Sequence, residues 1–209
     1  MKLKNQLKNE REEEGEEENK MTGIILFRAQ PFHNGHLAQI KRAYEDLTAN
    51  GGSQLYIFVG SADKFGTKRN PLPIDLRLDL IKGSLNEYYG ERWFSWEKYI
   101  HIVPLNDLSD EANNTHSWGY YLLNQIKSVV NDDKYIFYYS DRPEIALSWF
   151  NEELCKYIYF SFLPRVNNLN ATHVRDLIEY EWYDDLRSCV PPYVCGKAKE
   201  LHEYIINAK

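Results

Sequence analysis

Cysteine is scarce in this chain, and long apolar runs are absent from it. The 209 residues include three cysteines, Cys155, Cys189 and Cys195, an odd number without a Cys-x-x-Cys pair. Structural disulfides and a zinc knuckle are therefore not expected, and a reducing cytoplasm is the expected location. The longest apolar runs resemble Leu55–Val59, far short of the roughly 20 residues that a membrane-spanning helix needs. No apolar stretch follows the N-terminal lysines, so a secretory signal is not expected.

Positive charge is also in the minority. The 25 lysines and arginines face 31 aspartates and glutamates, which gives a net charge of −6. A general nucleic-acid binder normally carries a basic face, so this balance argues against one. An uneven charge distribution still leaves room for a local basic pocket that binds a phosphorylated ligand. The composition leaves a homo-oligomer open.

Residues 1–22 differ from the rest of the chain. The run Glu10–Glu18 is almost entirely charged and has almost nothing to bury, so we expect residues 1–22 to be a disordered acidic leader. A partner-binding tail is the alternative to a solvated leader. Residues 23–209 are enough for one domain with a substantial core and too few for two comfortable ones, so we expect a single domain there.

From Gly23 onward, short runs of β-forming residues alternate with helical patterns. The expected strands are Ile24–Phe27, Leu55–Val59, Tyr99–Val103, Tyr135–Tyr139 and Tyr157–Phe160. The expected helices between them are Gly35–Ala49, Ile74–Tyr88, His116–Val130 and Pro143–Cys155. Almost continuously apolar strands are typical of a parallel sheet that is covered on both faces.

The end of the chain, from Ala171 to Lys209, has only helical patterns. Pro191-Pro192 interrupts them, and an amphipathic helix is expected over Tyr193–Ile206. The whole pattern predicts an α/β fold, a doubly wound parallel sheet of Rossmann-like type with a helical C-terminal cap. In such sheets, ligands bind beyond the carboxyl ends of the strands, where the strand order reverses.

The segment after the first strand carries two histidines and an arginine. It contains the string Arg28-Ala29-Gln30-Pro31-Phe32-His33-Asn34-Gly35-His36 and leads into a helix. A helix N-terminus favours anions, and Gly35 lets a phosphate or nucleobase approach the backbone. Arg28, His33 and His36 add donors for a phosphoryl group. Capping histidines or a zinc site are the alternatives, but zinc needs a third ligand and no nearby carboxylate has an obvious spacing.

This string resembles the His-x-Gly-His signature of the nucleotidylyltransferase superfamily. Together with Arg28, it is similar to the form found in archaeal-type and Nudix-linked nicotinamide mononucleotide adenylyltransferases. The resemblance implies that Arg28, His33 and His36 contact ATP phosphates. It also implies that the ATP site includes Gln30, Phe32 and Gly35. Two positions depart from the family, because Phe27 stands where it has Gly and Ala29 where it has a bulky residue.

Three later segments resemble further blocks of the same family, in the expected order. Gly60-Ser61-Ala62, followed by Arg69-Asn70-Pro71, implies a phosphate contact by Arg69 and a helix that starts at Asn70-Pro71. The segment Tyr139–Pro143 resembles a block that lines the nucleotide site, which implies a role for Ser140. Thr172 and Arg175, at a helix start after the last strand, resemble the Ser-x-Thr-x-x-Arg block that holds the β- and γ-phosphates of ATP.

The segment after the third strand resembles the family's acceptor site. It carries Asp107, then Asn113-Asn114, then Trp118. The resemblance implies that Trp118 stacks on a nicotinamide ring and that an asparagine, taken as Asn114, contacts the amide. An indole is a suitable platform for a flat pyridinium cation. The alternative is that Trp118 is a core residue of its helix.

The resemblance implies a transfer of AMP from ATP to a small phosphorylated acceptor, nicotinamide mononucleotide, with Mg²⁺ held mainly by ATP. The expected partners are these two nucleotides, and neither nucleic acid nor membrane. Two alternatives stay open. One is another nucleotidylyltransferase of the superfamily, acting on phosphopantetheine or flavin mononucleotide or transferring a cytidylyl group. The other is a nucleotide-sensing module without turnover, which Phe27, Ala29 and Asp141 suggest.

Overall fold

The computed structural model describes residues 21–90, 95–108, 115–130, 132, 134–140, 143–166 and 169–209. The expected acidic leader therefore lies outside the described residues, apart from its last two positions. Of these, Thr22 is buried and already belongs to the first strand.

The centre of the molecule is a five-stranded parallel sheet. Its strands are β1 (Thr22–Phe27), β2 (Leu55–Val59), β3 (Ile100–Pro104), β4 (Tyr135–Tyr139) and β5 (Ile158–Phe162), in the spatial order β3-β2-β1-β4-β5. All four neighbouring pairs run parallel. The prediction of a doubly wound α/β sheet is confirmed. The strand order reverses between β1 and β4, so a ligand site is expected at their carboxyl ends.

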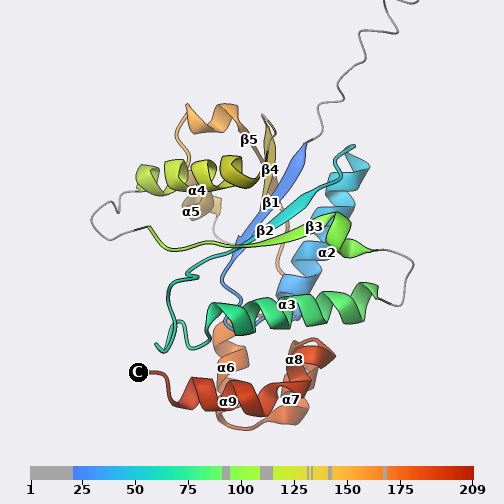
Figure 1. The fold of residues 1–209 in the computed structure, drawn as a ribbon, viewed down its shortest axis with the longest axis vertical. Coiled ribbons are helices and arrows are strands. Elements are labelled where there is room, and N and C mark those ends of the chain that lie inside the picture. Colours follow the sequence, from blue (N-terminus) through green and yellow to red (C-terminus); the bar gives the residue numbers. More distant parts are fainter. Residues whose placement is uncertain are drawn as a thin grey trace, which may run out of the picture.

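Helices cover both faces of the sheet and form the cap (Figure 1). The helices are α2 (Asn34–Ala49), α3 (Ile74–Tyr89), α4 (Thr115–Val129), α5 (Pro143–Ser148), α6 (Ala171–Glu179), α7 (Tyr183–Cys189), α8 (Pro192–Gly196) and α9 (Ala198–Ile206). Two 3₁₀ turns are η1 (Trp96–Lys98) and η3 (Leu154–Lys156). Helices α6 to α9 gather below α3 in Figure 1, which is the expected C-terminal cap.

Alternating residues of the strands build two separate cores. Ile25 and Ile57 face a core that also contains residues of α2, α3 and the C-terminal cap. Ile24 and Phe58 face a second core with residues of α4 and η3. This alternation follows from the period of two in a β-strand, and burial on both faces explains why the strands are apolar throughout.

Three predicted helix boundaries are wrong. The helix expected over Pro143–Cys155 ends at Ser148, and the Asn151 side chain accepts from the backbone N–H of Leu154 at 3.0 Å and begins η3. Such side-chain bonds compete with helix continuation. The resemblance implied a helix start at Asn70-Pro71, but α3 begins at Ile74, as the helical pattern predicted, and the Gln30 side chain holds the backbone of Leu72 before it. The last expected helix is divided at Lys197 into α8 and α9.

Within the part of the chain that the structure describes, no helix has the length and apolar character needed to cross a membrane.

Gly83 in α3 provides a test of how the cap docks. A Cβ atom at Gly83 would lie 2.2 Å from Cε1 of Tyr193 in α8. Alanine normally stabilises a helix interior relative to glycine, but here we expect Gly83→Ala to destabilise the protein by about 1–3 kcal/mol, because the tyrosine ring has to move. Urea unfolding measures the effect.

Gly196→Ala in α8 is the matched control, because a Cβ atom there would meet nothing within 4 Å. It should leave the free energy of unfolding unchanged or raise it. Equal stability of the two variants would contradict the docking described here.

Candidate functional site

A cavity of about 480 Å³ opens at the carboxyl edge of the sheet, next to the reversal between β1 and β4. It brings together predicted site residues from four segments of the chain. Those that line it are Arg28, Gln30, His33, Gly35, His36, Arg69, Ser140, Thr172 and Arg175. Its volume lies within the range of about 300–1,000 Å³ that is usual for small-molecule sites.

Three predicted site residues do not line the cavity, and a fourth lies outside the described residues. Phe32 is fully buried in the first core. Asp107 and Trp118 are not among the residues that line the cavity. Asn114, like Asn113, lies outside the described residues.

His33 and His36 cap the N-terminus of α2 reciprocally. Nδ1 of His33 accepts a hydrogen bond from the backbone N–H of Gly35 at 3.1 Å. The backbone N–H of His33 donates to Nδ1 of His36 at 3.3 Å. Because each Nδ1 is an acceptor, each neutral ring carries its proton on Nε2. Local capping therefore leaves both histidines with an Nε2–H donor.

The environment keeps both rings neutral. Burial, followed by the charge of Arg165, lowers the pKa of His33 to about 4. Burial, followed by His33 and Arg165, lowers the pKa of His36 well below its ordinary value. The two rings stack with their centroids 3.7 Å apart. At neutral pH they serve as hydrogen-bond donors and not as cations.

The start of α6 is bound to the loop that follows β1. Nη1 of Arg175 donates to the carbonyl of Gln30 at 2.8 Å, and Nη2 donates to Oγ1 of Thr172 at 3.1 Å. Asn170 caps the helix by accepting from the backbone N–H of His173 at 3.0 Å. Residues from opposite ends of the domain thereby share one cavity, as a common anion ligand requires.

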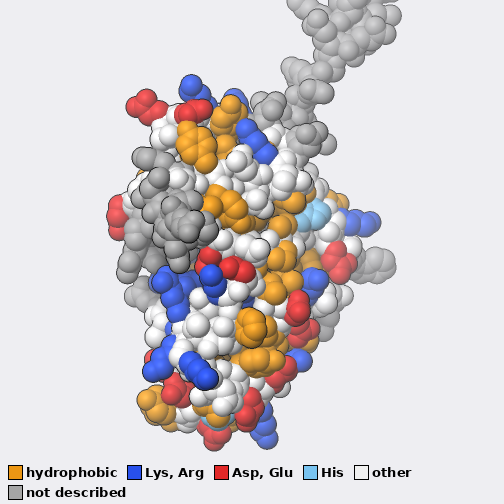
Figure 2. All heavy atoms as spheres, turned by 60° about the vertical axis from the view of Figure 1, so that its left-hand side comes forward, with side chains coloured by type: hydrophobic (Ala, Val, Ile, Leu, Met, Phe, Trp, Pro, Cys, Tyr) orange, Lys and Arg blue, Asp and Glu red, His pale blue; other side chains and the backbone are white. Residues whose placement is uncertain are grey.

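The cavity is strongly cationic. Arg28, Arg69, Arg165 and Arg175 line it, and none of the described residues that line it is acidic. Burial first, and then Arg69, lower the pKa of Arg28, while Asp107 opposes this shift. This charge is local, because the chain as a whole is acidic, and the face drawn in Figure 2 carries blue and red side chains together. Such a concentration of guanidinium groups suits a polyanion such as a triphosphate.

The described residues do not form a metal cage. Among them, no group of three or more His, Cys, Asp or Glu side chains could hold a metal ion. The cationic lining also disfavours a bare cation. A divalent ion in this cavity would have to come with an anionic ligand.

Arg77 in α3 is a residue that the sequence analysis missed. Its side chain is fully buried. Nη1 donates to the carbonyls of Arg28 and Gly60 at 2.9 and 2.8 Å, and Nη2 donates to that of Ser61 at 2.9 Å. Burial lowers its pKa to about 10, so it stays charged at neutral pH. No local motif marks it, because an arginine in a helical pattern suggests a solvated face.

Gln30 also connects loops through its side chain. Its Nε2 donates to the carbonyl of Leu72 at 3.1 Å, and its Oε1 accepts from the Leu72 backbone N–H at 2.9 Å. The side-chain amide is thus used within the protein. Gln30 contributes to the site through its backbone carbonyl, which Arg175 binds.

The expected acceptor residues lie at the end of β3 and on α4. Asp107 is exposed, and its Oδ1 accepts from Oγ of Ser61 at 2.9 Å. Its charge raises the pKa of Arg28, a residue that lines the cavity. Trp118 is partly buried and packs on Tyr121 and Trp149, with centroids 5.5 and 6.0 Å apart.

Known proteins share parts of this sequence and this fold. The Cytidylyltransferase-like family model matches residues 28–114. A nicotinamide-nucleotide adenylyltransferase of Pyrococcus furiosus is 25% identical over 180 residues, which cover 86% of this chain and 83% of the relative. One of Haloarcula marismortui is 29% identical over 92 residues, 44% of this chain and 42% of that protein. This second match therefore spans less than half the length of the relative.

A solved structure with the same fold is the bifunctional NMN adenylyltransferase/ADP ribose pyrophosphatase of Francisella tularensis, complexed with AMP and a manganese ion. The TM-score is 0.63 at 17% identity, and the match covers 90% of this chain and 52% of that one. The structural match agrees with the α/β fold described above. In sequence and in fold, the chain is therefore similar to nucleotidylyltransferases.

The lowered pKa of His33 makes stability depend on pH. The unfolded chain, with an ordinary His pKa of 6.5, binds this proton more readily than the folded chain does. The contribution is therefore complete above about pH 6.5 and is lost as the pH falls towards 4. Between pH 7 and 5 we expect His33 alone to lower the free energy of unfolding by about 2 kcal/mol.

Urea unfolding at both pH values measures this loss. In His33→Asn, which retains a capping oxygen but does not titrate, the difference between pH 7 and 5 should be smaller by about 2 kcal/mol. The same pH dependence in both proteins would show that His33 is not held neutral by the fold.

Proposed function

We propose that this chain transfers AMP from ATP to nicotinamide mononucleotide, giving NAD and pyrophosphate. The observation that carries the proposal is the shared cationic cavity of His33, His36, Thr172 and Arg175, without an acidic group among its described lining residues. The names of the similar proteins support this choice of acceptor.

In the proposed reaction, a 5′-phosphate oxygen of the acceptor attacks the α-phosphorus of ATP in line. A new P–O bond forms, and the bond between the α-phosphorus and the bridging oxygen breaks. The electron pair leaves with pyrophosphate. No group of the protein becomes covalently modified, so catalysis consists of positioning and of stabilising charge on the phosphoryl oxygens.

The histidines are suited to the second task. Capping holds each ring through Nδ1 and leaves its Nε2–H as a donor. Since both rings are neutral, they donate without exchanging a proton with solvent during the reaction. Donors fixed before the reaction stabilise a transition state without a cost of reorganisation.

In this proposal, different arginines bind different phosphate groups of ATP. Arg175 and Thr172, already hydrogen-bonded to each other at 3.1 Å, bind the departing pyrophosphate. Arg28, which follows β1, and Arg69, in the loop between β2 and α3, bind the remaining phosphate oxygens. Mg²⁺, which the described residues do not fit as a protein-only site, is carried by ATP oxygens and water and lowers the charge of the phosphates.

The acceptor is proposed to lie on the β3 side of the cavity. Trp118 offers an aromatic face for the pyridinium ring, and Asp107 offers a carboxylate to the positive charge of that ring. The arrangement leaves the 5′-phosphate near Arg28, whose charge already interacts with Asp107.

The decisive experiment is an incubation with ATP, nicotinamide mononucleotide and Mg²⁺, with the product identified by mass. We expect the dinucleotide and one pyrophosphate for each turnover. A panel with phosphopantetheine, flavin mononucleotide and a CTP-dependent acceptor, followed by pyrophosphate release, tests the other transferases. ATP binding in calorimetry without any product would instead support a sensing module.

His36 is expected to matter most for the chemical step. Replacing one fixed donor costs about 3 kcal/mol, roughly a hundredfold in rate, so kcat of His36→Ala should fall by about that factor. His36→Asn keeps an acceptor for the His33 N–H but lacks the Nε2–H, and it should show the same loss.

His202→Ala on α9, away from the cavity lining, is the control and should retain wild-type kcat. Full turnover by both His36 variants would refute the role assigned to this donor.

A further inference from the structure

Arg69 reaches the cavity from an exposed loop. The residues from Asp63 to Arg69 are all exposed, and the loop has no regular secondary structure. Within the loop, Thr67 and Asn70 exchange backbone bonds of 3.3 and 3.0 Å, and the backbone N–H of Gly66 donates to the carbonyl of Pro71 at 3.4 Å. These bonds are made within the loop and do not attach its tip to the rest of the domain. The Arg69 side chain, on such a loop, would lose much conformational entropy when it binds a ligand.

The segment after α9 pairs with this loop. The backbone N–H of Lys209 donates to the carbonyl of Gly66 at 3.0 Å, and the backbone N–H of Lys68 donates to the carbonyl of Lys209 at 3.1 Å. Lys209 thus bonds to the two residues on either side of Thr67, which is the hydrogen-bond pattern of a parallel bridge. The side chain of Lys209 takes part in neither of them.

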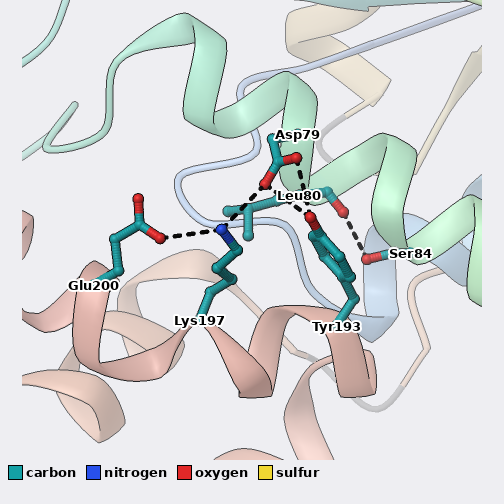
Figure 3. A network of polar contacts seen from close by, with 6 residues as sticks. All are labelled: Asp79, Leu80, Ser84, Tyr193, Lys197 and Glu200. Atoms are coloured by element: carbon teal, nitrogen blue, oxygen red, sulfur yellow. Dashed lines mark hydrogen bonds and ion pairs between the residues drawn. The ribbon is translucent and has the colours of Figure 1, made fainter.

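The helices that precede this tail are attached to α3 by polar contacts. Tyr193 Oη donates to the carboxylate of Asp79 at 3.0 Å, and Lys197 lies between Asp79 and Glu200 at 3.7 and 3.2 Å (Figure 3). These contacts join α8 and the start of α9 to α3. Helix α9 also packs on α6, which carries Thr172 and Arg175.

The other end of the loop is fixed as well. Gln30 holds both backbone groups of Leu72, three positions beyond Arg69. Arg69 therefore lies between two attachment points, one from the loop after β1 and one from the C-terminal tail. The tail therefore links the loop that carries Arg69 to α9, which packs on α6, the helix that carries Arg175.

We propose that residues 207–209 are a positioning element of the triphosphate site: their backbone bridge to Gly66 and Lys68 orders the loop so that Arg69 can bind phosphate. The proposal rests on the proposed function for the identity of the ligand. It adds that affinity for ATP depends on a segment that does not contact ATP.

Lys209→Pro tests the bridge directly, because proline lacks the N–H that binds Gly66. Lys209→Ala keeps that N–H and is the matched control. A chain that ends at Asn207 removes the bridge altogether. The readouts are the dissociation constant of ATP by calorimetry, kcat and KM for ATP, and hydrogen exchange of the Lys68 amide without nucleotide.

We expect the dissociation constant and KM for ATP to rise on the order of fivefold in Lys209→Pro and in the shortened chain, with kcat close to that of the wild type. Lys209→Ala should match the wild type. The Lys68 amide should exchange faster in the first two variants only. In an Arg69→Ala background, Lys209→Pro should add no further loss, because both changes remove the same contact.

Unchanged ATP affinity in the shortened chain, or equal losses with and without Arg69, would overturn the proposal. If the wild type binds ATP but transfers nothing, the proposed function fails and the affinity comparison still decides this inference. If the wild type does not bind ATP at all, faster exchange of the Lys68 amide on shortening supports the bridge, and unchanged exchange overturns it.

Discussion

One buried guanidinium joins the loops from which the site is built. Arg77 binds the carbonyls of Arg28, Gly60 and Ser61, the residues at which β1 and β2 leave the sheet. Three charge-assisted bonds in a fully buried place are strong. The positions of Arg28, and of Ser61 with its partner Asp107, depend on this contact. Gln30 and Arg175 then extend the same scaffold to the loop before α3 and to α6.

Given that scaffold, the cavity concentrates positive charge without any ligand. Four arginines line it, and their mutual repulsion opposes a closed arrangement. Backbone carbonyls and Asp107 offset part of this repulsion. The histidines add none, because burial and Arg165 keep both rings uncharged. The protein thus places fixed hydrogen-bond donors around a cavity whose positive charge a polyanion would neutralise. Binding of the anion would relieve the repulsion between the arginines, and this favours binding.

Much of this arrangement could be predicted from sequence. Strands buried on both faces leave a continuous apolar signal, so β2 and β4 begin and end where the pattern indicates. In a doubly wound sheet, residues after each strand meet at one edge, which brings Arg69, Ser140 and Arg175 into one cavity. The parts that were missed depend on single side chains. The hydrogen bond from the backbone N–H of Leu154 to the Asn151 side chain leaves no periodic pattern in the sequence. The burial of Arg77 depends on carbonyls that two distant loops contribute.

The motif departures at Phe27 and Ala29 have a physical explanation in the structure. Ala29 is buried and has a φ of 52°, a left-handed conformation that bulky side chains adopt with strain. A small side chain there lowers that strain. Phe27 lines the cavity, and its ring lies 4.5 Å from that of His36, which also stacks on His33. His36 is therefore held by rings on more than one side, and the extra apolar surface favours its neutral form. Compared with the family pattern, the large side chain is at Phe27, beside His36, and the small one is at Ala29, where the backbone is strained. Both changes are compatible with a His36 side chain held in place for phosphate chemistry, which argues against a site that has lost this role.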